Sequence, residues 1–147
     1  MPLSRERIRR YEDKISFITE DLEWLNKWLP ADEEEFIADV KTRKAIYKLV
    51  QEITDCIMDL VAMMIKDEGR TVQDDYSNLI RMRELGIINV KLEKGLRELN
   101  GLRNVLVHRY NGIDDRLAFR SIMGLEDTIR EFLKVIKSWL KEKSSKR

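Results

Sequence analysis

Hydrophobic residues recur at helical spacing along almost the whole chain, beginning in residues 4–29. Their steps are three or four positions, which places them on one face of a helix. These positions are Ile8, Tyr11, Ile15, Ile18, Leu22, Leu25 and Trp28. Pro30 ends the segment, because proline lacks the N–H that a continuing helix needs. The pattern therefore predicts a long first amphipathic helix.

A second and longer helix is predicted over residues 32–66. Asp32 precedes it as an N-cap, with Glu35 three residues later, which is a variant of the capping box. Its apolar stripe consists of Phe36, Val40, Ala45, Ile46, Leu49, Val50, Ile53, Ile57, Leu60, Val61 and Met64. The period is weaker near Asp39, which predicts a kink there. Gly69 is expected to end the helix as its C-cap.

Two further helices are predicted before the last segment. The first is short and covers residues 75–85, where Gly86 ends it. The second covers residues 89–110 and is followed by Asn111-Gly112, a dipeptide typical of turns. Both helices therefore end at glycine-containing turns rather than at prolines.

The last predicted helix is capped by Asp114 and covers residues 114–141, loosened at Gly124. The polar tail 142–147 is expected to fray. Neither repeats nor a linker interrupt the series of helices. The predicted fold is all-α, an up-and-down four-helix bundle with an additional short helix, in a single domain over residues 1–147.

Composition restricts the chemistry that this bundle can carry. The chain has 147 residues, with 28 Lys or Arg, 27 Asp or Glu, one His and one Cys. A single Cys56 excludes an internal disulfide and paired-cysteine zinc sites, and one His excludes a His–His pair within one chain. The net charge of +1 excludes the strongly basic composition of many nucleic-acid binders, although a local basic patch stays possible. No apolar run is long enough to span a membrane and the N-terminus has no signal-peptide pattern, so a cytoplasmic location is expected.

Polar residues interrupt the apolar pattern near the end of the 89–110 helix. They are Arg103, Asn104, His108 and Tyr110. In an ideal helix Arg103 and Tyr110 are about 20° apart around the axis, whereas His108 is about 140° from Arg103. His108 therefore needs a local distortion, or a second chain, to join Arg103. On its own, a histidine at the end of a helix also has a plain explanation, since a cation there is favourable without any function.

The stretch Arg103 to Tyr110 resembles the R-x4-6-H signature of the HEPN superfamily. More narrowly, Arg103, His108 and Tyr110 fit the R-x4-H-x-Y form of the HepT-like toxins. The resemblance extends over residues 40–125 and includes the long second helix, the short helix with its Gly-Ile-Ile connection, and the turn after the motif.

This resemblance implies a metal-independent endoribonuclease that acts as a toxin and needs no cofactor or metal. Cleavage through a 2′-OH requires proton transfers and a cation beside the phosphate. His108 suits the acid–base role and Arg103 suits the phosphate, while Asn104 would orient a ring or an oxygen. Tyr110 would donate a hydrogen bond. One His per chain is too few for two proton transfers, so a homodimer with two motifs in one cleft is expected to cut the RNA substrate.

The same resemblance implies a protein partner. HepT-like proteins are commonly paired with a minimal nucleotidyltransferase, the antitoxin, which transfers AMP to the motif tyrosine, here Tyr110. The added phosphates would place negative charge beside His108 and fill the cleft.

Other charged residues have two interpretations that the sequence leaves open. Asp55 and Asp59 share a face of the second helix, so one of them supports the motif, or both belong to a solvated stripe. Arg97, Arg109 and Arg116 flank the motif and either contact RNA phosphates or lie on ordinary solvated faces.

A different class of function also fits the sequence. The lone histidine and the near-neutral charge are compatible with a non-catalytic interaction module that binds a nucleotide or a nucleotidyltransferase. Such a module would not cleave RNA.

Overall fold

The computed structural model describes residues 2–109 and 112–145 of the chain, and this part is helical without any strand. Its elements are α1 (Arg5–Trp28), α2 (Glu33–Ala38), α3 (Val40–Asp67), α4 (Asp75–Glu84), α5 (Val90–His108), α6 (Asp115–Met123) and α7 (Leu125–Ser145).

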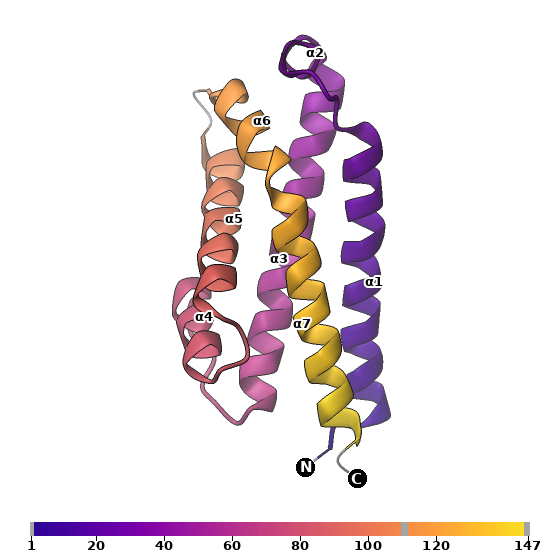
Figure 1. Cartoon of the computed structure of the whole chain (residues 1–147), viewed down its shortest axis with the longest axis vertical. Coiled ribbons are helices and arrows are strands. Elements are labelled where there is room, and N and C mark those ends of the chain that lie inside the picture. Colours follow the sequence, from indigo (N-terminus) through magenta and orange to yellow (C-terminus); the bar gives the residue numbers. More distant parts are fainter. Residues whose placement is uncertain (1, 110–111, 146–147) are drawn as a thin grey trace.

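The four long helices α1, α3, α5 and α7 run alternately up and down and form the bundle (Figure 1). The short helix α4 packs against α3 and α5 at the end where the chain termini lie, and α2 and α6 meet at the opposite end. The predicted all-α, up-and-down bundle with an additional short helix is therefore confirmed. No helix in the described ranges is both long and apolar enough to cross a membrane.

The centre of the bundle is filled by the apolar stripes that the spacing predicts. α3 contributes the longest of them, and its fully or almost fully buried members are Ile46, Leu49, Val50, Ile53, Ile57, Leu60, Val61 and Met64. Val40 was expected in this stripe but is 52% exposed, because it lies at the first residue of a new helix rather than inside a continuous one.

Polar side chains fix where the helices begin. In each case the side chain accepts a hydrogen bond from a backbone N–H in the first turn, which satisfies a group that the helix itself leaves unpaired. The N-caps are Ser4, Asp32, Asp39, Asp74, Asn89 and Asp114. The cap at Asn89 sets the start of α5, the helix that carries the motif.

Two of the predicted helices are each divided in the structure. The kink expected at Asp39 is a full break, because Asp39 leaves the helical conformation and caps α3, accepting from the Thr42 N–H at 3.0 Å and from its hydroxyl at 2.6 Å. The loosening expected at Gly124 is also a break, which separates α6 from α7.

The last helix extends into the polar tail. α7 continues to Ser145, so the helix covers the first four residues of the segment 142–147 that is expected to fray. Trp139 and Leu140 are buried just before the tail, and Lys143 Nζ lies 2.8 Å from the Glu68 carboxylate of the loop after α3. These contacts hold the last turns against the bundle.

A buried carboxyl group lies at the contact between α1 and α3. Asp21 is 8% exposed, and its Oδ2 has no hydrogen-bond partner within the described part of the chain. Burial raises the pKa of Asp21 to about 7, and the neighbouring carboxyl of Glu52 adds to the rise. At neutral pH the folded protein therefore holds a carboxyl group that is poorly solvated when charged.

We expect this group to make the protein less stable as the pH rises. Between the ordinary aspartate pKa of about 4 and the folded value of about 7, the folded state binds more protons than the unfolded state, so the free energy of unfolding falls with pH. Asp21→Asn removes this loss and is expected to stabilise the protein at pH 8 by on the order of 2 kcal/mol, with little change near pH 4. Urea unfolding of both proteins at the two pH values measures it.

The exposed Glu23 on the same helix supplies the control. Glu23→Gln is expected to leave the pH dependence as it is. An equal gain from Asp21→Asn at pH 4 and pH 8 would show that the effect is one of packing and not of ionisation.

Candidate functional site

Arg103 is held in a fixed position by Asp55, across the contact between α5 and α3. Arg103 Nε donates to Asp55 Oδ1 at 2.7 Å, and Nη2 donates to Oδ2 at 3.3 Å. This two-point contact orients the plane of the guanidinium as well as its position. Of the two acids on this face of the predicted second helix, Asp55 therefore faces the motif and supports Arg103.

Asn104 and Asp75 complete the surroundings of Arg103. Arg103 Nη1 donates to Asn104 Oδ1 at 3.3 Å, so two consecutive residues of the motif contact each other. Asp75 is the first residue of α4. Partial burial raises the pKa of Asp75, while the nearby charge of Arg103 opposes this rise. Helices α3 and α5 therefore supply the polar groups that contact Arg103, and Asp75 on α4 lies near enough to feel its charge. Nothing in the sequence indicates this proximity, since an acid at the start of a helix is common.

The Arg103 guanidinium retains donors for a ligand. A guanidinium has five N–H groups, and three of them are used in the bonds to Asp55 and Asn104. One N–H on Nη1 and one on Nη2 are left without a partner within residues 2–109 and 112–145. The side chain is 23% exposed, so these donors can reach an anionic oxygen that approaches from solvent.

Asp59 has a different partner from Asp55. Its carboxylate lies 3.6 Å from Lys14 Nζ on α1 and is largely exposed. The two acids share a face of α3, but among the described residues of the motif a contact is formed with Asp55 and not with Asp59.

His108 lies apart from Arg103 in the single chain. It is the last residue of α5 and is exposed, and within the described ranges no residue forms a hydrogen bond or an ion pair with it. The helix stays regular up to His108, so the local distortion that could bring it to Arg103 is not present before it. In a regular helix two residues that are five apart lie about 140° apart around the axis, so Arg103 and His108 are on different faces of α5. Tyr110, the fourth residue of the motif, lies outside the described residues.

The flanking arginines have separate environments. Arg97 lies 5.3 Å from the ring centroid of Tyr76 and 3.6 Å from the Glu93 carboxylate. Arg109 is exposed and lines a hollow of about 450 Å³ between α5 and α6. Arg116 contacts Glu33 and Glu34 on α2, which raise its pKa, so its charge is balanced at the end of the bundle.

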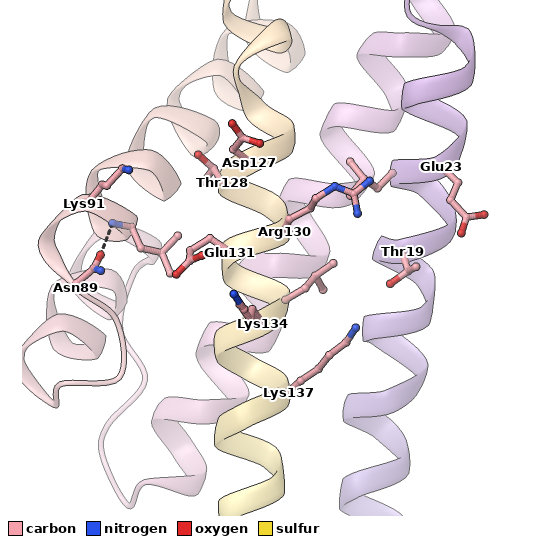
Figure 2. A pocket seen from close by; sticks show the side chains of 13 residues that line it. Thr19, Glu23, Asn89, Lys91, Asp127, Thr128, Arg130, Glu131, Lys134 and Lys137 are labelled. Atoms are coloured by element: carbon pink, nitrogen blue, oxygen red, sulfur yellow. Dashed lines mark hydrogen bonds between the residues drawn. The ribbon is translucent and has the colours of Figure 1, made fainter.

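A hollow of about 930 Å³ lies away from the motif. Figure 2 shows its polar side chains, which project from α1, α7 and the start of α5. Lys91, Lys134 and Lys137 face it together with the acids Glu23 and Glu131, so its charge is mixed. Among the residues that the structure describes, no group of three or more His, Cys, Asp or Glu side chains is arranged to hold a metal ion.

Comparison with known proteins assigns the family. Residues 18–136 match the family model described as Ribonuclease HepT-like. The chain belongs to the HepT-like family. This match covers α3, α4 and α5, and therefore every helix that contributes to the Arg103 site.

Two relatives of the HepT-like chain carry names that describe an activity. A protein of Archaeoglobus fulgidus named "Putative RNase" is 36% identical over 136 residues, covering 92% of this chain and 97% of the relative. The protein named tRNA nuclease HepT from Aphanizomenon flos-aquae is 25% identical over 134 residues, covering 88% of each chain. The family assignment thus rests on similarity along nearly the whole length.

A solved structure has the same fold as this HepT-like protein. The tri-AMPylated HEPN toxin of Shewanella oneidensis, in complex with its MNT antitoxin, superposes with a TM-score of 0.80. The two chains are 18% identical, and the match covers 92% of this chain and 99% of the toxin. At that identity the likeness establishes the HEPN fold.

The Arg103–Asp55 contact is expected to order the site rather than to stabilise the HepT-like fold. Both side chains are partly exposed, at 23% and 45%, and ion pairs in such positions contribute less than about 1 kcal/mol. Asp55→Ala is therefore expected to lower the free energy of unfolding by less than about 1 kcal/mol in urea titrations. A loss above about 3 kcal/mol would mean that Asp55 is needed for folding.

Proposed function

We infer that this protein is a metal-independent endoribonuclease toxin whose site is built around Arg103 and His108. The observation that supports it most is the guanidinium of Arg103, which Asp55 orients and which has two donors without a partner among the described residues, available for a phosphate oxygen. Membership of the HepT-like ribonuclease family supports the same reaction.

The proposed reaction uses the 2′-OH of the RNA as the nucleophile. A base takes the 2′-OH proton, the 2′ oxygen bonds to phosphorus, and the bond from phosphorus to the 5′ oxygen of the next nucleotide breaks. An acid protonates that leaving oxygen, so a cyclic phosphate and a 5′-OH result. His108 supplies the acid–base group and Arg103 stabilises the charge on the phosphorane oxygens. Arg97 and Arg109 contact neighbouring phosphates, whereas Arg116 is left out because Glu33 and Glu34 balance it.

The reaction is proposed to require a homodimer. His108 and Arg103 lie on different faces of a regular helix, and one chain has one histidine for two proton transfers. Two copies that meet at the motif supply two histidines and two arginines to one cleft.

The proposed regulator is a minimal nucleotidyltransferase that acts as the antitoxin. The structural likeness to a tri-AMPylated HEPN toxin bound to an MNT antitoxin supports this partner. In the proposed step the phenol oxygen of Tyr110 loses its proton and bonds to the α-phosphorus of ATP, the bond from that phosphorus to the bridging oxygen breaks, and pyrophosphate leaves. The new phosphate places negative charge two residues from His108 and repels an RNA phosphate.

Purified protein is expected to cleave RNA in the presence of EDTA. Arg103→Ala is expected to lower the rate by about 10²–10³-fold, because it removes the group that stabilises the phosphorane. His108→Ala is expected to lower it by about 10²–10⁴-fold, because it removes the proton transfers. Cleavage of a labelled RNA, followed on gels, measures both rates.

Arg120→Ala is the matched control, since Arg120 is an exposed arginine that pairs with Glu33 away from the motif. It is expected to retain full activity. Full activity of both Arg103→Ala and His108→Ala would remove the assigned site. A complete lack of cleavage by the wild type would leave the non-catalytic interaction module as the better description.

AMP transfer is expected to fall on Tyr110. Incubation with ATP and a nucleotidyltransferase encoded beside this protein is expected to raise the mass by whole AMP units and to abolish RNA cleavage. Tyr110→Phe is expected to prevent the mass increase, whereas Tyr76→Phe, at an exposed tyrosine of α4, keeps it. Intact-mass spectrometry reads both. No increase with the wild type would contradict the proposed regulation and leave the nuclease assignment to its own test.

A further inference from the structure

The outer face of α3 carries a charge pattern that changes sign at its middle. Lys44 and Lys48 lie toward one end, and Asp55 and Asp59 lie toward the other. The uncharged Gln51 lies between them on the same face, since all steps are three or four residues. Asp55 and Asp59 have partners in the chain, Arg103 and Lys14. Lys44 and Lys48 have no ion-pair partner within residues 2–109 and 112–145, and as like charges four apart they oppose each other.

Exposed aromatic rings lie beside this face on α1. Phe17, Trp24 and Trp28 are 43%, 38% and 43% exposed, and their spacing places them within about 20° of one line along the helix. The Trp24 and Trp28 rings contact each other, with centroids 5.0 Å apart. Phe17 also lines a hollow of about 450 Å³ between α1 and α3, together with Lys48, Gln51, Asp55 and Asp59. The aromatic stripe is therefore continuous with the charged face and with the acid that holds Arg103.

We propose that a second copy of this chain docks on the α1–α3 face, with the two α3 helices antiparallel and the two-fold axis passing near Gln51. In that arrangement Lys48 meets the partner's Asp55 and Lys44 meets the partner's Asp59. The pattern matches itself only in this direction, because parallel helices would bring like charges together. Such self-complementarity is the requirement of a two-fold interface.

The size of the face fits a stable dimer. α3 has 28 residues and is about 42 Å long, and with α1 beside it the face is about 20 Å wide. That area can supply the roughly 800 Å² per partner that a specific interface buries. Exposed aromatic rings next to a charged rim are also the usual composition of such interfaces.

This inference rests on the proposed homodimer and states where its axis lies. Asp55 is less than four residues from the axis along α3, so the two Arg103–Asp55 pairs are about 10 Å apart along the helix direction. Both copies of the site then open at the same interface, which is the arrangement that the proposed cleavage needs.

Charge reversal tests the interface. Lys44→Asp and Asp59→Lys each replace two attractions by two repulsions, one on each side of the axis, so each is expected to raise the dimer Kd at least tenfold. The double variant Lys44→Asp with Asp59→Lys restores opposite charges across the axis and is expected to return the Kd to within a few-fold of the wild type. Analytical ultracentrifugation over a concentration series measures the Kd, and circular dichroism checks that each variant folds.

The aromatic stripe is tested separately. Phe17→Asp is expected to yield monomers, whereas Val90→Asp, at a 69% exposed apolar residue of α5, leaves the dimer intact. Three results would each overturn the proposed interface. They are an unchanged dimer Kd in both single charge reversals, a double variant whose Kd does not return toward the wild-type value, and a monomeric wild type. RNA cleavage assayed on the same samples separates the two proposals. If the variants cleave RNA and their dimer Kd is unchanged, the nuclease assignment stands and the proposed interface is overturned. If the dimer Kd values change as expected but no sample cleaves RNA, the interface stands and the nuclease assignment is overturned.

Discussion

The burial of one stripe of α3 is the constraint on which the rest of the structure depends. This helix packs against α1, α4 and α5, and its apolar residues from Ile46 to Met64 occupy the centre of the bundle. Once that stripe is buried, the opposite face of the same helix has to lie outside. The outer face carries Asp55, which then stands beside α5 at the height of Arg103. The position of the site is therefore a consequence of the packing of α3 and requires no special loop.

Most of the fold could be predicted from the sequence because the helices have strong periodicity and clear ends. Apart from the start of α3 at Asp39, each boundary that a cap or a proline marks lies within two residues of its predicted place, as at Ser4 and Asn89. The predicted helix bounds differ from the structure where two sequence signals favour different local conformations. Asp39 lies inside an apolar period that continues on both sides, yet its side chain makes better hydrogen bonds as a cap than inside a helix. In the tail, polar composition predicts fraying, whereas α7 continues to Ser145 and Lys143 contacts the distant Glu68.

The sequence allows the candidate residues of the site to be selected, but it does not show which of them contact one another. Periodicity alone gives Asp55 and Asp59 the same face, and only the position of α5 and α1 decides that one holds Arg103 and the other Lys14. Asp75 was missed because it resembles any acid at the start of a helix. The angular separation of His108 from Arg103 could be calculated from the sequence, and the regular end of α5 preserves it.

The distribution of arginine partners explains how a nearly neutral chain is compatible with the proposed RNA substrate. The segment around the motif carries an excess of arginines, but acids that are distant in sequence balance several of them: Glu33 and Glu34 hold Arg116, and Asp55 holds Arg103. Few cations are then left to release counterions from RNA, so non-specific affinity from that source is small. Recognition in such a site depends on geometry, and the two-point contact with Asp55 supplies it by fixing the direction in which the remaining Arg103 donors point. The acid that lowers the net charge of the site is thus the group that orients its principal cation.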